Sequence, residues 1–216
     1  LQNEQIAASV FSLTIQKDSI PTPQLGQFFM LKAEPSSVLL ARPISVYKCD
    51  EKSVTFLILQ KGRGTEELCA LEPGNEISVI GPSGNTFPLP NEVAPLASLL
   101  PHGECRVALV GAGIGVAPIA SLALSPLFLN KSCIFDFYAS FRSLPYGLDG
   151  IEERLRRLVV TTEDGSFGVK GILPAVFKAQ DYDLVYACGP TPMLRYVQKE
   201  IATANEARAG FAPIQG

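Results

Sequence analysis

Three glycines follow an apolar stretch in the sequence RVALVGAGIGVAPIASLAL. Gly111 and Gly113 have the spacing of the dinucleotide-binding pattern G-x-G-x-x-G, whereas the third glycine comes one place early, at Gly115, and Val116 holds the expected position. A strand that turns into a helix at such a loop presents free N–H groups to a diphosphate, and Pro118 suits the first helical turn. The spacing predicts a nucleotide site. The alternative is a glycine turn that only packs a helix on a strand.

The residues at the end of the next expected strand bear on which nucleotide would bind. In the standard pattern an acidic residue there holds the ribose hydroxyls. Here Asp136 lies inside the strand, and Ser140 and Arg142 stand at its end. An arginine and a serine at this place can hold a 2′-phosphate, which favours NADPH slightly over NADH. The alternative is that Arg142 is an ordinary exposed loop residue.

A second group of residues suited to an anion lies in the first half of the chain. Arg42 precedes Pro43 in the segment LARPISVYKCD, and Ser45 follows on the same expected strand. Alone, this arginine could be a surface residue of the strand. Downstream, in LQKGRGTEEL, Gly64 and Thr65 open an expected helix, whose first N–H groups and dipole favour a phosphate. Two anion sites in two halves of the chain fit two nucleotides that meet at an interface.

The segment VYACGPTPML places Cys188, Gly189 and Pro190 at the end of the last expected strand. In an open parallel sheet, ligands bind at this edge. The alternative for Cys188 is a small buried apolar residue.

The two halves of the sequence predict different elements. Short segments rich in Val, Ile, Phe and Thr predict an antiparallel β-barrel or sandwich in the first half. Alternating strands and helices predict a doubly wound parallel sheet in the second. We expect a β-barrel at 1–90, a linker at 91–104 and an α/β domain at 105–216. The expected strands are 9–16, 26–33, 44–50, 53–60, 75–81, 106–113, 133–140, 158–164 and 183–190, and the expected helices are 64–74, 115–125, 150–157, 171–179 and 191–204.

Composition excludes several classes of function. The chain has 216 residues and a net charge of −3, so a nucleic-acid partner has no electrostatic support. No apolar run is long enough to span a bilayer and no signal peptide is evident, so we expect a cytoplasmic protein without a membrane partner. The five cysteines lack C-x-x-C spacing, which argues against a disulfide framework or a metal site. The single histidine, His102, is most simply a linker residue, so a Ser-His-Asp hydrolase is not expected.

Together these segments resemble the ferredoxin–NADP reductase superfamily and, within it, the electron-transfer subunits of the two-component, NAD-linked dihydroorotate dehydrogenases. The resemblance implies FAD on the barrel and NAD(H) or NADP(H), as substrate, on the α/β domain. It implies a catalytic dehydrogenase subunit or another redox protein as partner, and a role in pyrimidine biosynthesis. The matching stretches cover nearly the whole chain in the family's order: GQFFML, RPIS, KGRGT, GPSGNTF, GAGIGVAP, EDGSFGVKG and CGPTPML.

The resemblance also implies roles for single residues. Arg42 would pair with the flavin diphosphate, which Gly64 and Thr65 would also hold, and Pro43, Ile44 and Ser45 would line the flavin ring. Ser45 and Cys188 would be catalytic by positioning the two rings rather than as nucleophiles. Glu163 and Asp164 would lie near the same cleft, unless they form a solvated turn. With Ser140 and Arg142 included, the expected cofactor-binding residues are Arg42, Pro43, Ile44, Ser45, Leu59, Gln60, Gly62, Gly64, Thr65, Gly111, Gly113, Ile114, Gly115, Pro118, Ser140, Arg142, Glu163, Asp164, Cys188, Gly189, Pro190 and Met193.

One departure from the family concerns iron. Its members normally end in a cysteine-rich segment that binds a [2Fe–2S] cluster, whereas no cysteine follows Cys188 here. The chain therefore does not support a cluster, either because a segment is missing or because this member has none. Three other interpretations stay open: a stand-alone NAD(P)H:flavin or ferredoxin reductase, the flavin subunit of another redox complex such as a hydrogenase, and a regulatory subunit that binds nucleotides without turnover.

Overall fold

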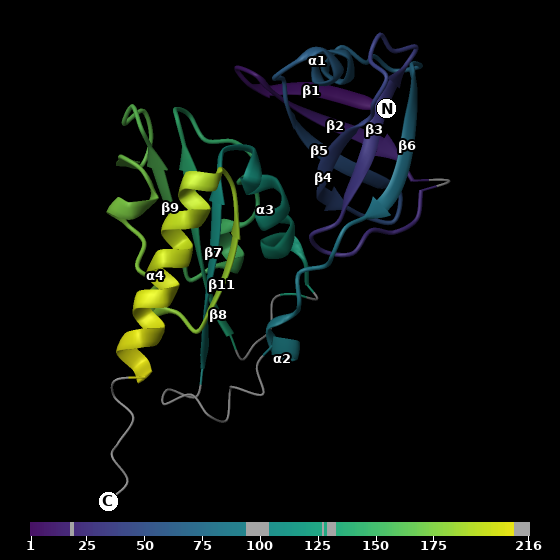
Figure 1. The fold of residues 1–216 in the computed structure, drawn as a ribbon. Helices are drawn as coiled ribbons and strands as arrows, with labels where there is room; N and C mark the ends of the chain where they lie inside the picture. Colours follow the sequence, from purple (N-terminus) through teal and green to yellow (C-terminus); the bar gives the residue numbers. More distant parts are fainter. Residues whose placement is uncertain (18–19, 94–103, 127, 129–132, 210–216) are drawn as a thin grey trace, which may run out of the picture.

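Two β-sheets, built from successive parts of the chain, form the two lobes of the structure (Figure 1). The computed structural model describes residues 1–17, 20–93, 104–126, 128 and 133–209. The first sheet is antiparallel and has six strands in the order β1-β2-β5-β4-β3-β6; it curls into a barrel-shaped lobe. The second is parallel and has five strands in the order β10-β9-β8-β7-β11. Both sheets confirm the predicted fold class.

The first lobe buries one face of its strands, and the alternation of buried and partly exposed residues is clearest in β3. In β3, Phe29, Leu31 and Ala33 are buried, whereas the residues between them are partly exposed. Burying one face of each strand against the others is the main force that holds such a sheet together. Its elements are β1 (Gln2–Ala7), β2 (Val10–Gln16), β3 (Phe28–Glu34), β4 (Arg42–Cys49), β5 (Ser53–Leu59), α1 (Arg63–Cys69) and β6 (Glu76–Ser83).

The sequence did not predict β1. Its residues, QNEQIA, have no alternation of apolar and polar side chains, and most of them are exposed. The strand is held at the edge of the sheet by its ladder with β2 and by the Asn3 side-chain amide, which donates hydrogen bonds to three carbonyls around the end of α1. A polar edge strand leaves no hydrophobic period to detect.

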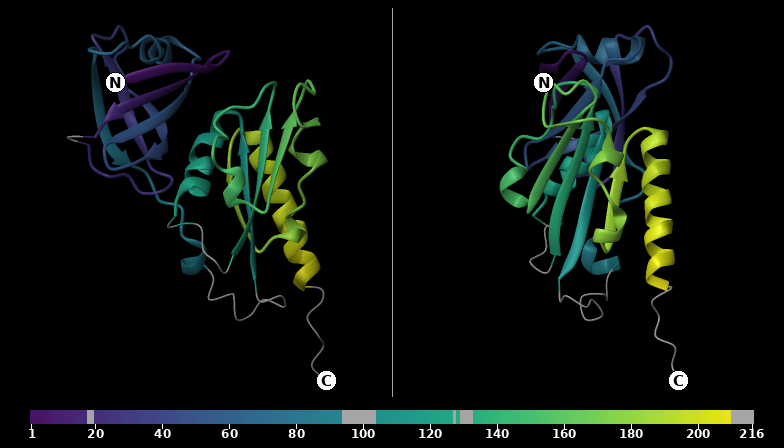
Figure 2. Two further views of the ribbon diagram at one scale, coloured as in Figure 1. Left: turned by 180° about the vertical axis from the view of Figure 1, so that it is seen from behind. Right: turned by 90° about the vertical axis from the view of Figure 1, so that its left-hand side faces the viewer.

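The second lobe has helices on both faces of its sheet. Val107 and Leu109 of β7 pack with α3 on one face, while Ala108 and Val110 pack with α4 on the other (Figure 2). A strand buried on both faces reads as a continuous apolar run, as β7 does. Its elements are β7 (Cys105–Ala112), η2 (Gly113–Gly115), α3 (Val116–Leu124), β8 (Cys133–Phe141), η3 (Glu152–Arg154), β9 (Arg157–Thr162), β10 (Val169–Lys170), η4 (Leu173–Ala175), η5 (Ala179–Asp181), β11 (Leu184–Cys188) and α4 (Thr191–Ala209).

Two predicted helices were wrong. The segment 150–157 contains only the single 3-10 turn η3, because Arg156 and Arg157 are extended toward a buried carboxylate and Arg157 already begins β9. The segment 171–179 contains only η4 and the first residue of η5, because Gly171 has a φ of +131° and the chain then turns to bury Leu173 and Phe177. A tertiary ion pair with Asp136 overrode the helical pattern in the first segment, and the backbone conformation of Gly171 did so in the second.

The predicted linker at 91–104 falls mostly outside the described residues, and so does His102. At its start, α2 (Pro90–Val93) is a single helical turn. The exact division of the chain into domains therefore stays a prediction. Within the described ranges, no helix combines the length and apolar character needed to cross a membrane.

A hydrophobic core joins the two lobes. Tyr47 and Leu57 of the barrel belong to the same buried cluster as α3 of the second lobe. Gly147 has a φ of +68°, and a Cβ there would lie 2.7 Å from the Leu57 side chain, so the 145–150 loop fits tightly against the barrel. Because this interface is apolar and buried, it fixes the lobes relative to each other.

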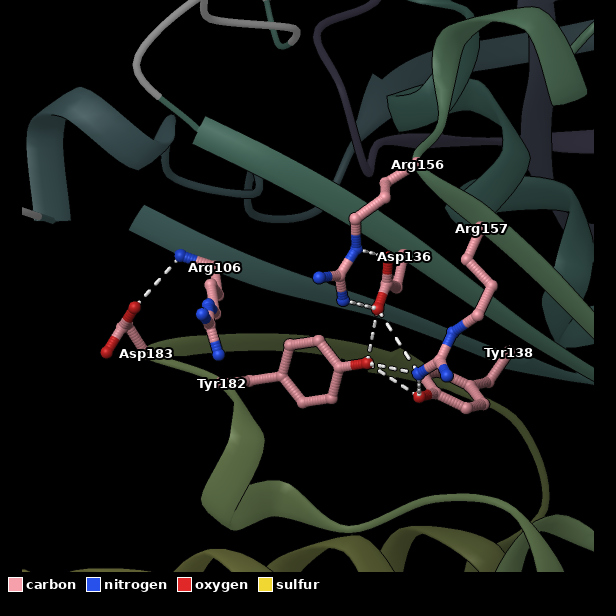
Figure 3. A network of polar contacts seen from close by, with 7 residues as sticks. All are labelled: Arg106, Asp136, Tyr138, Arg156, Arg157, Tyr182 and Asp183. Atoms are coloured by element: carbon pink, nitrogen blue, oxygen red, sulfur yellow. Dashed lines mark hydrogen bonds and ion pairs between the residues drawn. The ribbon is translucent and has the colours of Figure 1, made fainter. Parts of the chain in front are cut away.

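The most concentrated polar network lies in the second lobe, around the fully buried Asp136 (Figure 3). Arg156 binds both of its carboxylate oxygens, and Tyr182 donates a hydrogen bond of 2.6 Å to it. Arg157 approaches to 3.3 Å and also binds the hydroxyl of Tyr138. Burial raises the pKa of Asp136, but the hydrogen bonds and positive charges of its partners outweigh burial and lower it.

We predict that Asp136→Asn destabilises the fold by about 3 kcal/mol, because it leaves two arginines beside a buried site without their anion. Because the folded-state pKa of Asp136 is depressed, this contribution is present above the ordinary aspartate pKa of about 4 and is lost as the pH falls through the lower folded value. Urea unfolding at neutral pH measures the loss. The exposed Asp181→Asn is the matched control and should change little. Equal stabilities of the two variants at neutral pH would contradict this account of the network.

Candidate functional site

Strands β4 and β5 separate at the end that carries Arg42. Their ladder runs only from Val46 onward, whereas residues 42–45 pair with β3 and residues 57–59 pair with β2. Within the described part of the chain, the facing edges of these two segments thus carry no ladder between them. Backbone N–H and C=O groups require hydrogen-bond partners. Because no strand pairs with these two edges, their N–H and C=O groups are available to bind a ligand.

Arg42 lies against the first turn of α1. A Cβ added to Gly64 would lie 2.5 Å from the Arg42 Nε, so the guanidinium covers the place that a side chain would fill. The first N–H groups of a helix have no acceptor within the helix. A guanidinium beside a helix N-terminus supplies a fork of donors and positive charge, which suits a diphosphate.

The hydroxyl of Thr65 is already engaged with the loop that leads into α1. It accepts hydrogen bonds from the N–H groups of Lys61 and Gly62 and donates one to the Gly62 carbonyl. The Thr65 N–H also donates to the Gly62 carbonyl, so both donors of Thr65 are engaged and its role as a phosphate ligand stays a prediction. Nothing lies within 4 Å of a Cβ built on Gly62, so the approach to the turn is open there.

Of the three residues predicted to line a flat ring, two are placed to do so. Pro43 is exposed and Ser45 is partly exposed, on the outward face of β4 that also carries Tyr47. The side chain of Ile44 instead packs into the barrel core with Phe29, so that only its backbone can face a ligand.

Each glycine of the central loop serves a different physical purpose. Gly111 allows α3 to pack on β7, because a Cβ there would lie 2.9 Å from the Cα of Val116. Gly113 has a φ of +53° and open space around it, so it supplies the left-handed turn and leaves room for a ligand. A Cβ on Gly115 would lie 2.4 Å from the carbonyl oxygen of Cys188. The departure from the standard glycine spacing thus has a cause: position 116 is a core position, and position 115 meets β11.

Loop and last strand form one surface. A Cβ at Gly189 would lie 3.1 Å from the Ala112 Cβ and 2.5 Å from the end of the Met193 side chain, so both residues pack closely against Gly189. Burial raises the pKa of the Cys188 thiol, so the group is neutral rather than a thiolate nucleophile. The structure thereby brings Gly115, Cys188 and Met193 together, as predicted, and adds Ala112, which the glycine pattern alone could not identify.

The predicted residues of the two lobes meet. The end of β5 contacts η2, and Leu59 of the barrel packs on the same cluster as Ile114 of the glycine loop. Gln60 follows Leu59 and is held by its N–H bond to the Ser9 carbonyl. Pro118 is buried in the first turn of α3, and Pro190 is exposed directly before α4. The candidate site is therefore the junction of the β4–β5 ends with the η2–β11 surface.

The residues expected to recognise a 2′-phosphate are only partly available. Ser140 is buried, and its hydroxyl bonds that of Thr161 at 2.7 Å, so it is not free to bind a phosphate. Arg142 is exposed just after β8. Arg142 alone, without the Ser140 hydroxyl, gives only weak support for NADPH as the nucleotide.

Glu163 and Asp164 follow β9, two strands away from β7 along the same sheet edge. Asp164 accepts a hydrogen bond from the Ser166 N–H, which lowers the pKa of its carboxyl. Both residues are exposed. A turn that is stabilised by Asp164 accounts for this motif without a ligand.

The two cavities described in the structure lie elsewhere. One of about 1110 Å³ runs between the lobes past Tyr47 and Phe87 to the end of α3, and one of about 500 Å³ lies between Ile6 and the 145–153 segment. None of the predicted cofactor-binding residues lines either cavity. The candidate site therefore depends on backbone edges and glycine contacts rather than on an enclosed cavity.

No profile of a known protein family matches the chain. Individual proteins do. It is 37% identical over 204 residues to the "Dihydroorotate dehydrogenase B (NAD(+)), electron transfer subunit" of Clostridium acetobutylicum, a match that covers 94% of this chain and 76% of that protein. The protein of the same name from Clostridium perfringens is 34% identical, with 91% and 74% covered. The chain thus spans about three quarters of the length of these relatives.

Solved structures share the fold at lower identity. An NADH-dependent reduced ferredoxin-NADP oxidoreductase superposes with a TM-score of 0.73 at 23% identity, over 94% of this chain and 71% of that one. The flavohem-like FAD/NAD binding domain of nitric oxide dioxygenase from Vibrio cholerae gives a TM-score of 0.73 at 16% identity, over 94% and 90%. Both lobes therefore match a known two-lobe arrangement.

We predict that Gly115→Ala destabilises the protein by about 1–3 kcal/mol or more, because the new methyl would collide with the backbone of Cys188, which cannot move aside. The backbone at Gly115 is helical, so φ strain does not contribute. Gly62→Ala is the control: its site is open and extended, and it should cost less than about 1 kcal/mol as a helix N-cap change. Denaturant midpoints measure both. Full stability of Gly115→Ala would show that the loop and β11 do not touch.

Proposed function

The chain belongs to the family of dihydroorotate dehydrogenase B electron-transfer subunits, and from this we propose that it is an FAD-dependent oxidoreductase that relays electrons between NAD(H) and a catalytic dehydrogenase subunit. The relatives at 37% and 34% identity support this activity and the place in pyrimidine biosynthesis. One structural observation supports it most: the Arg42 guanidinium lies on Gly64 at a helix N-terminus, beside strand ends whose backbone edges are free.

FAD fits the barrel at these residues. Arg42, Gly62 and the first turn of α1 would hold the diphosphate, and the free edges of 42–45 and 57–59 would bind the edge of the ring system. Pro43 and Ser45, which face outward, would lie against the ring. When bound, FAD supplies the chemistry that the side chains lack: it accepts two electrons from a nicotinamide and passes them on singly or in pairs.

The glycine loop would hold the nicotinamide nucleotide. Gly113 leaves open space at the loop tip, and the loop leads into α3, whose N-terminal groups attract a diphosphate. We propose NADH as the nucleotide, because the relatives' name specifies NAD(+) and because the Ser140 hydroxyl is engaged with Thr161. Recognition of a 2′-phosphate would rest on Arg142 alone.

Ser45 and Cys188 would orient the two rings. A neutral, partly buried thiol and a hydroxyl are suited to packing and hydrogen bonding rather than to nucleophilic attack. The contribution of the protein is then orientation and the exclusion of water at the junction of the lobes. A cytoplasmic location follows as part of the same proposal.

We predict that the purified protein binds stoichiometric FAD and that Arg42→Ala weakens FAD binding about 10–100-fold, because a charge-assisted hydrogen bond contributes about 1.5–3 kcal/mol. Arg142→Ala, an arginine outside the FAD site, is the matched control and should leave FAD binding unchanged. Flavin fluorescence titration of the apoprotein measures both. Equal FAD affinity in the Arg42 variant and the parent protein would contradict the assignment.

We predict that NADH bleaches the flavin absorbance of the loaded protein under anaerobic conditions at lower concentrations than NADPH does. This separates the proposal from a regulatory subunit that binds nucleotides without turnover. Loaded protein that keeps its full visible absorbance at saturating NADH and NADPH would exclude the oxidoreductase function. If the protein instead prefers NADPH and Arg142→Ala abolishes that preference, the nucleotide is NADPH and Arg142 recognises its 2′-phosphate.

A further inference from the structure

The loop that joins β3 to β4 leads directly into Arg42, the residue proposed to bind the flavin diphosphate. Every residue between Ala33 and Ile44 is described by the structure, and none of them has a buried side chain. Leu39 is 89% exposed, so even an apolar residue of the loop stays in water. Burial of apolar surface therefore does not hold this loop on the barrel.

Backbone pairing does not fix the loop either. The ladder between β3 and β4 ends at the pair of Leu31 and Arg42, and the ladder between β3 and β6 runs only to Glu34. Residues 35–41 make no backbone–backbone hydrogen bond to another described residue. The conformation of the loop therefore depends on hydrogen bonds that involve side chains.

One carboxylate makes most of these bonds. Glu67, on α1, accepts hydrogen bonds from the hydroxyls of Ser36 and Ser37 and, at 2.9 Å, from the Ser37 N–H. The Ser36 hydroxyl in turn accepts a hydrogen bond of 3.1 Å from the Val38 N–H. Because the Ser36 and Ser37 donors stabilise the charged carboxylate, they lower the pKa of Glu67, and the group is ionised at neutral pH. We call Glu67, Ser36 and Ser37 the carboxylate clamp.

The carboxylate clamp and Arg42 contact the same side of α1. Gly64 and Glu67 are three residues apart, so they are neighbours on the helix surface, separated by about 4.5 Å along its axis. The Arg42 guanidinium lies on Gly64, where an added Cβ would be 2.5 Å from the Arg42 Nε. The loop is thus bound to α1 at two points, through hydrogen bonds at residues 36–37 and through packing at Arg42.

The helix that carries both contacts is itself fixed on the barrel. Leu68 is fully buried in the core of the barrel, and Leu71, just after the helix, belongs to the same cluster. The Asn3 amide also donates hydrogen bonds to three carbonyls around the end of α1, which lies at one end of the first lobe (Figure 1). Because α1 is anchored by burial, a loop that is bound to it has a defined position relative to Gly64.

We propose that Glu67 is a positioning residue for FAD: its carboxylate holds the β3–β4 loop so that the Arg42 guanidinium is in place on Gly64 before the flavin diphosphate binds. This inference rests on the proposed function, which assigns the diphosphate to Arg42. A guanidinium whose position is already ordered loses less conformational freedom when it binds its ligand. Glu67 does not itself bind the diphosphate, because two anions repel each other.

The sign of the effect separates positioning from simple electrostatics. Glu67 is an anion near the site proposed for another anion, so charge repulsion alone predicts tighter FAD binding when Glu67 is removed. Loss of positioning predicts weaker FAD binding instead. Ser36→Ala/Ser37→Ala breaks the same clamp but keeps the Glu67 charge, so positioning predicts weaker binding by this variant as well.

The test measures FAD affinity by fluorescence titration of the apoprotein, for the full chain and its variants. Glu67→Ala and Ser36→Ala/Ser37→Ala should each weaken FAD binding about 3–10-fold, as expected when one or two side chains must be ordered on binding. Glu72→Ala, which removes an exposed carboxylate beyond the end of α1, is the matched control and should bind FAD like the parent protein. Circular dichroism of each variant establishes that it is folded.

A double-mutant cycle tests whether Glu67 acts through Arg42. In an Arg42→Ala background, Glu67→Ala should change FAD affinity less than about twofold, because the group that it positions is gone. Equal weakening in both backgrounds would show a general structural role and overturn the proposal. FAD binding by Glu67→Ala that is as tight as in the parent, or tighter, would overturn it too.

The parent protein and Arg42→Ala separate this inference from the proposed function. If the parent binds no FAD, the proposed function itself has failed. If the parent binds FAD and Arg42→Ala weakens that binding while Glu67→Ala does not, only the positioning role of Glu67 has failed.

Discussion

Two backbones touch where β7 and β11 end, and only a residue without a side chain permits it. Gly115 lies against the carbonyl of Cys188, and Gly189 lies against Ala112. These contacts bring the glycine loop and the last strand into one continuous surface at the carboxyl edge of the sheet. Because loop and strand are fixed against each other, a ligand held by the loop is also positioned relative to Cys188. The geometry of the site in this lobe depends on that close approach.

The barrel forms the other half of the candidate site, and it too depends on a close contact at a glycine. Because Gly64 has no side chain, the Arg42 guanidinium can pack directly against it, next to the N-terminus of α1. The β4–β5 ladder stops short of this point and leaves backbone edges exposed. The apolar contact of α3 with the barrel, through Tyr47 and Leu57, then holds the two half-sites together. Glycine contacts thus create each half-site, and hydrophobic burial joins them.

The sequence predicted the parts of the fold that depend on local pattern. Continuous apolar runs identified β7 and β8, and glycine spacing identified the loop at 111–115. It could not predict β1, whose polar residues are held by pairing and by Asn3, nor the extended course of Arg156 and Arg157, which Asp136 determines from another strand. At the site, the sequence identified the glycines and Arg42 as candidates. It could not predict the burial of Ile44 or the hydrogen bond between Ser140 and Thr161, because both depend on neighbours distant in sequence.

The central claim is that the two half-sites place a nicotinamide ring on a flavin ring. Stacked rings of this kind give a broad absorption band at long wavelength, which neither nucleotide gives alone. Titration of the chemically reduced, FAD-loaded protein with NAD⁺ under anaerobic conditions should produce this band in step with NAD⁺ binding measured by calorimetry. NAD⁺ binding without any such band would show that the two nucleotides do not meet, and would contradict the account.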